Sequence, residues 1–412
     1  MTERMGRLLT VLHRKGLGSF LYRIGSACGR YTAKAVGSLL FRKLPIKENY
    51  IVFESEGDFC DSARAFYEYL LVHNYHERYR LIWIVKEPKQ YCAPPNVRFI
   101  SRQKQFFSSV CFFYYVLVSK YFIFTHPSWF TYRREGQLVV NIWHGIPIKD
   151  GISKDLSAAF DVIFCSSENT RPWFNKFCGA KEEQDIVLGY PRNDLLFQSG
   201  HALEKLPGCG GYQKVIICMP TYKQTENWVD SEKVLPFYIQ GIESRQQLEE
   251  FNDVLAQMNM LFLVKIHHLQ DLSFLNEVEL SHIRYLKDAD LLHCDVQLYH
   301  LLGEADALLT DYSSVYLDYL LIDRPVGFLL GDIDTYIAGR GFLFDDYLSY
   351  MPGAKLYDYA DLVAFVHEVQ SGIDQYSADR KRVRDFTNFY QDNNNCQRFA
   401  QWLGLQESPE IG

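Results

Sequence analysis

The segment EADALLTDYSSVYLDYLLIDRP, residues 304–325, holds residue types that could bind a phosphate. Its ALLT run is typical of a buried strand, and the apolar residues that follow recur at helical spacing. The spacing predicts that Asp311 opens a helix with Ser313 and Ser314 in its first turn. Hydroxyls and backbone N–H groups at the positive end of a helix dipole can bind a pyrophosphate. Asp and Ser also favour helix starts by simple capping, so both interpretations are open at this point.

A second segment, NIWHGIPIKD at residues 141–150, places a histidine where a strand ends. The strand is expected to finish at Trp143, so that His144 and Gly145 lie at its carboxyl end. Histidine titrates near neutral pH, which suits the removal of a hydroxyl proton during phosphoryl transfer. Gly145 would let a substrate approach the backbone. The alternative for His144 is a structural side chain bonded to a neighbouring loop.

Three further segments end in polar or charged residues. They are LVKIHHLQD with Lys265, His267 and His268, MPTYKQT with Thr221 and Lys223, and GYPRND with Arg192. Lysine, arginine and histidine side chains at such strand ends could neutralise a phosphate. Taken alone, each segment is better explained as a solvated strand end or a plain turn.

These segments need a scaffold, and the rest of the pattern indicates an α/β fold. Short apolar runs from residue 50 alternate with helical stretches, which predicts parallel sheets covered on both faces. The Gly-rich stretch 199–214 reads as a linker between two Rossmann-like, doubly wound domains. We therefore expect a first domain at 48–205 and a second at 206–412, which a C-terminal helix closes. Ligands bind such folds at the open ends of the strands.

Residues 1–47 form a basic segment with ten Lys or Arg residues against one acidic residue. Apolar residues recur in it at helical spacing, which favours an amphipathic helix on an anionic membrane surface. A solvated basic helix that caps the first domain is the alternative.

Composition excludes several classes of protein. The chain has 412 residues and a net charge of −7, which argues against nucleic acid as the main partner. Its ten cysteines include no C-x-x-C pair, so neither a disulfide framework nor a zinc site is indicated, and a reducing cytosol fits. No secretory signal is visible. The apolar run at 106–124 is broken by polar residues and reads as a buried helix that runs into a strand.

Taken together, the segments resemble the CDP-glycerol glycerophosphotransferase family of teichoic-acid and capsule biosynthesis. The matching pieces stand in the family's order over about residues 50 to 395. They are VFESEG, NIWHGIPIK, GYPRND, PTYK, KIHH, LLTDYSSVYLDYLLIDRP, RGFLFDDY and MPG. The resemblance implies a glycosyltransferase-B type fold. In that fold the second domain would bind the CDP donor, and the first, with the N-terminal helix, would meet a lipid-linked acceptor.

The resemblance also implies a site. The family's two important histidines fall on His144 and His267, and its donor-phosphate serines fall on Ser313 and Ser314 beside Asp311. The remaining donor-binding candidates are Lys265, Thr310, Thr221, Lys223 and Arg192. The chain departs from the pattern at His268, where the family commonly has Pro, and at Lys223, where it commonly has Arg. Lysine keeps the charge of arginine and loses its bidentate fork.

The implied enzyme transfers a polyol phosphate, glycerol phosphate foremost, from a CDP-activated donor to a hydroxyl of a lipid-linked cell-wall or capsule polymer. CMP would leave, His144 would act as general base, and His267 with Lys265 would neutralise the diphosphate. No metal site is indicated, although Mg²⁺ could accompany the CDP donor. The protein would work peripherally at the cytoplasmic face of the membrane. Two alternatives are a nucleotide-sugar glycosyltransferase of the same fold and a non-catalytic scaffold at the membrane surface.

Overall fold

The computed structural model describes residues 32, 35–101, 106–126, 134–150, 156–221, 224–225, 228–229, 237–266, 272–276 and 278–407. Most of the basic segment 1–47, including residues 1–31, lies outside this part of the chain. Within the described ranges no helix has both the length and the hydrophobicity that a bilayer crossing requires. The apolar run at 106–124 forms a helix, α3 (Phe106–Val118), followed by a strand, β4 (Ser119–Phe124), as predicted.

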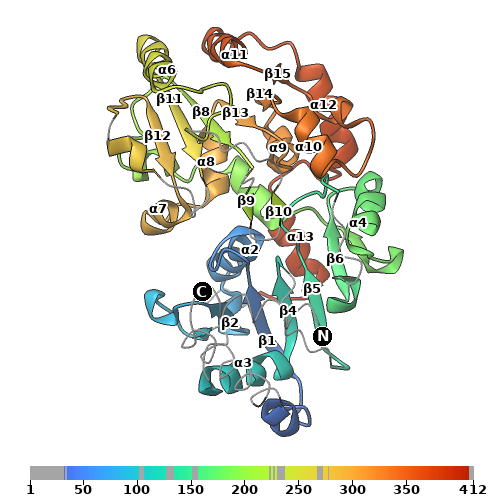
Figure 1. The fold of residues 1–412 in the computed structure, drawn as a ribbon. Helices are drawn as coiled ribbons and strands as arrows, with labels where there is room; N and C mark the ends of the chain where they lie inside the picture. The colour runs from blue at the N-terminus through green and yellow to red at the C-terminus, as the bar shows by residue number, and fades with distance from the viewer. Residues whose placement is uncertain are drawn as a thin grey trace, which may run out of the picture. The chain divides into compact units, whose positions relative to one another are not determined.

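The strands of the first sheet are short and apolar. They are β1 (Lys47–Glu54), β2 (Arg80–Val85), β3 (Val97–Ser101), β4, β5 (Leu138–Asn141), β6 (Val162–Cys165) and β7 (Asp185–Val187), in the order β3-β2-β1-β4-β5-β6-β7 (Figure 1). β1 pairs with β2 and β4 in parallel, and Phe53 stacks on Trp83 with ring centroids 5.4 Å apart. Residues 81–85 of β2 are fully buried, which is why these five positions are all apolar rather than only alternate ones.

The second sheet is also parallel and has the order β12-β11-β8-β13-β14-β15 (Figure 1). Its strands are β8 (Lys214–Met219), β11 (Met260–Lys265), β12 (Ile283–Leu286), β13 (Ala307–Thr310), β14 (Val326–Leu329) and β15 (Ala354–Leu356). A two-stranded antiparallel ribbon joins β9 (Gln224–Thr225) to β10 (Trp228–Val229). From β8 the chain adds strands on one side, and then returns to add β13 on the other. The reversal between β8 and β13 is a topological switch point, where ligands bind in such sheets.

The helices pack through apolar faces at helical spacing. α6 (Arg245–Gln257) starts at a capping box, in which Ser244 Oγ accepts from Gln247 N at 3.2 Å, and it buries Leu248, Phe251 and Leu255. Phe251 meets Phe262 of β11 edge to face. Further helices are α2 (Asp61–Val72), α4 (Arg171–Cys178), α5 (Ala202–Lys205), α7 (Asp288–His293), α8 (Leu298–Glu304), α9 (Val315–Tyr319), α10 (Ile333–Gly339), α11 (Tyr359–Ser371), α12 (Ser377–Thr387) and α13 (Asn395–Trp402).

The chain divides into two compact units. The first holds Met1–Trp143, Ala158–Val162 and Gly404–Gly412, and the second holds His144–Ser157 and Ile163–Leu403. The two sheets divide between β7, which ends at Val187, and β8, which begins at Lys214, and the domain boundary near residue 205 stays a prediction. His144 is part of the second unit, together with the second sheet. The α/β fold with two parallel sheets and helices is confirmed.

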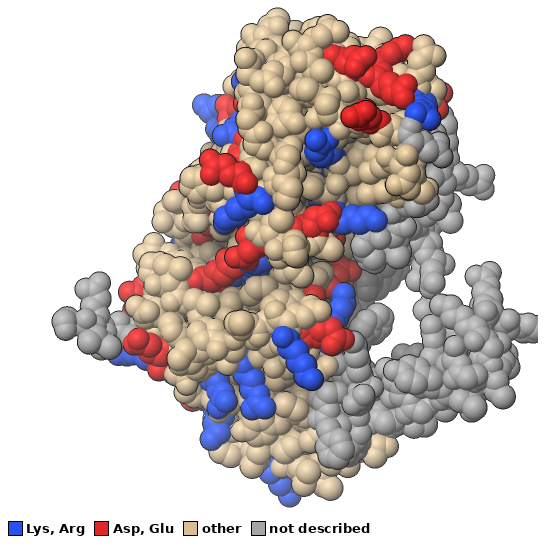
Figure 2. Space-filling model, turned by 90° about the vertical axis from the view of Figure 1, so that its left-hand side faces the viewer, with Lys and Arg blue, Asp and Glu red and all other residues tan. Residues whose placement is uncertain are grey.

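Charges of both signs lie on the surface. On the face shown in Figure 2, Lys and Arg side chains are interspersed with Asp and Glu side chains. Most of the nine cysteines among the described residues are buried or half-buried, as reduced thiols in apolar surroundings are.

Asp185 is a buried carboxylate at the start of β7, with only 4% of its surface exposed. Burial raises its pKa to about 7, against the opposing charge of Arg171. The unfolded chain releases this proton around the ordinary carboxyl pKa of 3.8, whereas the folded chain still holds it at higher pH. Stability should therefore fall as the pH rises from about 4 to about 7.

We expect Asp185→Asn to flatten this fall, because an amide has no charge to desolvate. At pH 8 the variant should exceed the native chain in stability by at most about 4 kcal/mol, the free energy that corresponds to raising the pKa of this carboxyl from 3.8 to about 7. Thermal unfolding followed by circular dichroism between pH 4 and pH 8 measures it. Asp253→Asn, at an exposed position of α6, is the control and should leave the profile unchanged. Parallel profiles for Asp185→Asn and the native chain would contradict the assignment.

Candidate active site

The carboxyl ends of β8 and β13 are tied together by Asp311. Its carboxylate accepts hydrogen bonds from Thr221 N at 2.9 and 3.0 Å and from Thr221 Oγ1 at 2.6 Å. Thr221 follows β8 and Asp311 follows β13, so this bond lies at the switch point of the second sheet. The sequence predicted that Asp311 opens a helix, but in the structure the helix begins later, at Val315. The Asp311 side chain instead fixes the loop after β8.

The segment that follows His144 reaches the same place. Lys149 Nζ donates to Thr221 Oγ1 at 3.1 Å, which brings a cation next to the Asp311 carboxylate. The segment is held by the RGFLF residues, since Lys149 forms an antiparallel bridge with Phe342. Leu343 N donates to Ile148 O at 2.9 Å. Two of the sequence pieces that resemble the family, far apart in the chain, are thus paired backbone to backbone.

His144 lies in a sharp turn between two unusual backbone conformations. Trp143 has φ 43°, in the left-handed region that non-glycine residues rarely adopt, and Gly145 has φ 136°, which favours glycine. The Trp143 N–H donates to Asn141 Oδ1 at 3.0 Å, and Asn141 is fully buried. This bond fixes the strand end, so the half-buried His144 is presented by a defined turn.

Gly145 allows two side chains to approach the backbone next to His144. A Cβ atom on Gly145 would lie 3.0 Å from Arg192 Nη2 and 3.1 Å from Ser314 Oγ. The sequence suggested that Gly145 leaves room for a substrate. The structure fills that room with the guanidinium of Arg192 and the hydroxyl of Ser314. Three segments, around residues 145, 192 and 314, therefore converge within the second unit.

The helix after β13 is shorter than its sequence pattern predicted. α9 begins at Val315, with Ser314 as its N-cap residue and no side-chain capping bond. A helix of one turn and a half adds little dipole field. Any anion binding here therefore depends on the Ser313 and Ser314 hydroxyls and on Arg192 more than on the helix. Ser313 and Ser314 are both half-buried.

The remaining candidates divide into two groups. Thr310 is fully buried, and its hydroxyl donates to Met219 O at 2.8 Å, so it links β13 to β8. Lys265 forms an ion pair of 2.8 Å with Asp288 and donates to Ile266 O. These bonds hold both side chains to the sheet and its adjoining helix rather than to Arg192 or Ser314. His267, His268 and Lys223 lie outside the described residues, so their predicted roles stay predictions.

In the GYPRND turn, Asp194 stabilises the fold and Arg192 lies at the candidate site. Asp194 is buried and accepts from Asn395 N at 2.9 Å and from Cys396 N at 2.8 Å, which satisfies the start of α13. Arg192, two residues earlier, points to Gly145 instead. This division explains why the turn needs two opposite charges so close together.

Sequence reasoning missed Lys149. The residue belongs to the quoted NIWHGIPIK segment, and its charge was the only signal, because nothing in the spacing linked it to Thr221. The contact between them appears only once β8 and β13 are adjacent.

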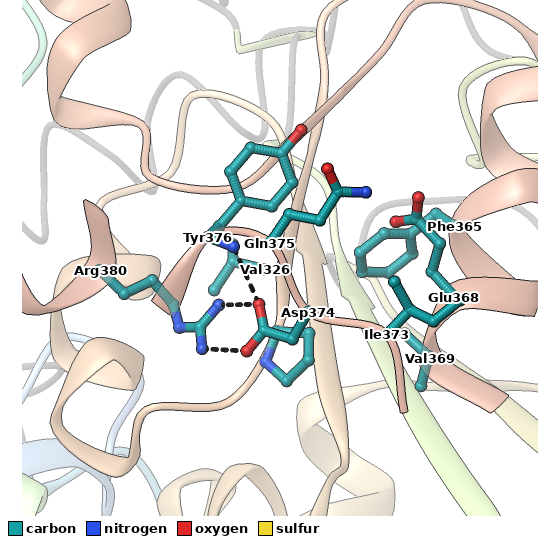
Figure 3. Close-up of a pocket in the computed structure, with 10 residues that line it drawn as sticks. Val326, Phe365, Glu368, Val369, Ile373, Asp374, Gln375, Tyr376 and Arg380 are labelled. Carbon is teal, nitrogen blue, oxygen red and sulfur yellow. Dashed lines mark hydrogen bonds and ion pairs between the residues drawn. The ribbon is translucent and has the colours of Figure 1, made fainter. Parts of the chain in front are cut away.

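A pocket in the second unit lies elsewhere (Figure 3). Its lining includes Pro325 and Val326, at the amino end of β14, with Asp374 and Arg380. The candidate residues follow the carboxyl ends of the neighbouring strands. The pocket therefore does not belong to this site.

Comparison with known proteins identifies the family. The model of the CDP-Glycerol:Poly(glycerophosphate) glycerophosphotransferase family matches residues 38–403. The chain belongs to this family. The enzyme class predicted from the sequence, a CDP-glycerol glycerophosphotransferase, is thereby confirmed, as is a link to teichoic-acid and cell-wall biosynthesis.

Individual relatives are distant. A teichoic acid poly(glycerol phosphate) polymerase from Staphylococcus epidermidis is 26% identical over 75% of the chain, but that match spans only 44% of the polymerase's own length. A teichoic acid glycerol-phosphate transferase from Staphylococcus aureus is 26% identical over 82% of the chain and 88% of its own length. The solved structure of the wall teichoic acid polymerase TagF has a TM-score of 0.73 at 20% identity, covering 98% of this chain and 96% of that one. This likeness confirms the predicted fold type.

We expect Gly145→Ala to weaken CDP-glycerol binding about tenfold or more, because the new methyl group must displace Arg192 or Ser314. Strain from the positive φ adds about 1–3 kcal/mol of destabilisation. Gly211→Ala is the control, since Gly211 also has a positive φ (+90°) but no atom lies within 4 Å of the position that a Cβ would take there. Calorimetric titration with CDP-glycerol compares the two. Equal affinities for both variants would contradict the close approach at Gly145.

Proposed function

We propose that this chain transfers glycerol phosphate from CDP-glycerol to a hydroxyl of a teichoic-acid polymer and releases CMP. The observation that carries the proposal is the convergence at Gly145. Next to His144, whose imidazole is a side chain of the type that acts as a general base, lie a guanidinium and a hydroxyl suited to phosphate oxygens. Family membership supplies the donor class.

The proposed reaction is an in-line displacement at the β-phosphorus of the donor. The acceptor oxygen forms a bond to this phosphorus while the bond to the bridging oxygen breaks, and CMP takes the electron pair. His144 accepts the hydroxyl proton as the new bond forms. Little covalent chemistry falls to the protein in such a transfer, so positioning and charge neutralisation account for most of the catalysis.

The diphosphate is assigned to the second unit. Arg192 can offer parallel N–H donors to phosphate oxygens, Ser314 can donate a hydroxyl hydrogen bond, and Lys149 adds a point charge beside Thr221. In this proposal Asp311 and Thr310 position the loops and do not contact the donor. His267, Lys223 and a donor-bound Mg²⁺ remain predictions from the sequence.

His144→Ala should lower turnover by about 10²–10⁴-fold, the usual effect of losing a general base. Affinity for CDP-glycerol should change little, because the donor is held by other residues. The measurement is CMP release at saturating donor and acceptor, with donor affinity determined separately by calorimetry. His367→Ala, at an exposed position of α11, is the control and should be fully active.

Near-normal turnover of His144→Ala would refute the base assignment. The same assay, run with CDP-ribitol and with UDP-sugars, tests the donor. Turnover of a UDP-sugar in place of CDP-glycerol would favour the glycosyltransferase alternative, and no turnover of any donor would favour the scaffold.

For the acceptor we propose a lipid-linked polymer at the cytoplasmic face of the membrane, which the basic N-terminal segment would approach. The described end of that segment is part of the first unit. The Cβ of Phe113 lies 2.7 Å from where a Cβ on Gly37 would be, and Arg134 donates to Leu44 O at 2.7 Å. A deletion of the whole basic segment would therefore remove packed residues, so the test removes residues 1–31 only.

We expect the full chain to bind vesicles of anionic phospholipid and the chain without residues 1–31 to bind them much less. Each basic residue near such a surface contributes about 1 kcal/mol, so added salt should also release the full chain. Sedimentation with vesicles at low and high salt measures both effects, and neutral vesicles are the control. Binding that neither salt nor the deletion reduces would contradict a membrane role for this segment.

A further inference from the structure

The buried carboxylate of Asp318 lies beside Arg192, and the proposed reaction assigns it no role. Asp318 is 1% exposed, and its Oδ2 accepts from Arg192 Nη2 at 2.7 Å. The Tyr299 hydroxyl donates to the same oxygen at 2.5 Å, and Asn193 Nδ2 approaches Oδ1 at 3.4 Å. Several donors therefore hold the carboxylate, and the contacts from Tyr299 and Asn193 orient it independently of the guanidinium.

Aromatic rings restrict Arg192 further. Its Cζ lies 4.7 Å from the ring centroid of Tyr299 and 5.7 Å from that of Tyr190. Rings at these distances attract a guanidinium and limit how its plane can turn. Arg192 itself is 6% exposed, so it has little freedom to swing to another partner.

The short helix α9 explains how Asp318 and Ser314 act on one target. They are four residues apart, the spacing that places two side chains on the same helix face. Ser314 Oγ faces Gly145 beside Arg192 Nη2, and Asp318 bonds that same nitrogen. Ser314 thus places a hydroxyl beside Gly145, and Asp318, four residues further on, places a carboxylate on the guanidinium that lies there.

We propose that Asp318, oriented by Tyr299, is a positioning residue that aims the Arg192 guanidinium at the donor diphosphate. The inference rests on the proposed function, because it takes Arg192 as a ligand of the donor. A guanidinium presents its five N–H groups in a rigid plane, so fixing one nitrogen fixes the direction of the others. With Asp318 in place, binding the phosphate requires no reorientation of the arginine.

A purely structural ion pair is the competing explanation, and the second unit contains one for comparison. Arg380, 1% exposed, pairs with Asp374 at 2.5 Å and with Asp323 at 2.9 Å, beside the pocket at the amino end of β14 (Figure 3). Both arginines are buried and both have carboxylate partners. Only Arg192 lies beside His144 and Gly145. Asp374→Asn is therefore a matched control for Asp318→Asn.

The test is a double-mutant cycle on the full chain, with kcat/KM for CDP-glycerol as the readout. Asp318→Asn should lower kcat/KM by about 10–100-fold, as the loss of a charge-assisted hydrogen bond to an aimed group does. Arg192→Gln should lower it by at least as much. In the Arg192→Gln background, Asp318→Asn should change kcat/KM by less than about threefold, since its target is already gone.

Two further variants separate positioning from folding. Tyr299→Phe removes one hydrogen bond from Asp318 at nearly constant volume, and should lower kcat/KM in the same direction by a smaller factor. If Asp318→Asn does not fold, kcat/KM of Tyr299→Phe tests the positioning role of Asp318 in its place. Asp374→Asn should lower the melting temperature and leave kcat/KM of the folded enzyme unchanged.

Multiplicative effects of Asp318→Asn and Arg192→Gln would overturn the inference, because independent residues behave in that way. A higher kcat/KM for Asp318→Asn would overturn it as well, since it would show that the carboxylate merely offsets the charge of Arg192. If Asp318→Asn keeps full kcat/KM while Arg192→Gln and His144→Ala lose activity, this inference fails and the proposed function stands. If the native chain turns over no CDP-glycerol, the proposed function itself fails.

Discussion

The close approach at Gly145 is the constraint on which the rest of the candidate site depends. A side chain there would meet both Arg192 Nη2 and Ser314 Oγ at about 3 Å, so the site can assemble only around a residue without a Cβ. The residue must also adopt φ 136°, which again favours glycine. Sterics and backbone conformation therefore require the same residue at the position after His144. Everything else in the site is arranged to bring two polar groups to that point.

Bringing charges there has an energetic cost that the surrounding residues offset. Burying a guanidinium and a carboxylate removes both from water, and their attraction alone does not restore that loss. The bonds from Tyr299 and Asn193 to Asp318 reduce it by satisfying the remaining carboxylate lone pairs. Such a pair is poor evidence of stability, so its retention at the site is better explained by the direction it gives to Arg192.

The sequence predicted the scaffold well because one-dimensional patterns determine it. Buried parallel strands are apolar along their length, and strand–helix alternation predicted both parallel sheets. It also placed His144 directly after a strand. What it could not predict were contacts between distant segments. The bond from Lys149 to Thr221, the pairing of Ile148 with Leu343 and the unit to which His144 belongs all depend on which strands become neighbours.

Asp311 shows why local preference failed at this site. Aspartate before a serine pair and a helix satisfies every rule for a helix start, yet here a partner far along the chain competes for the carboxylate and wins. A hydrogen bond from the Thr221 backbone N–H, shared between both carboxylate oxygens, and a second one from the Thr221 hydroxyl outweigh one capping bond. The consequence reaches the chemistry, because the helix then starts later and is short. A diphosphate bound here would be neutralised by the side chains of Arg192, Lys149 and Ser314 rather than by a helix dipole. Side chains keep a fixed direction only where neighbouring residues restrict them. That requirement is what makes the buried surroundings of Arg192 part of the site.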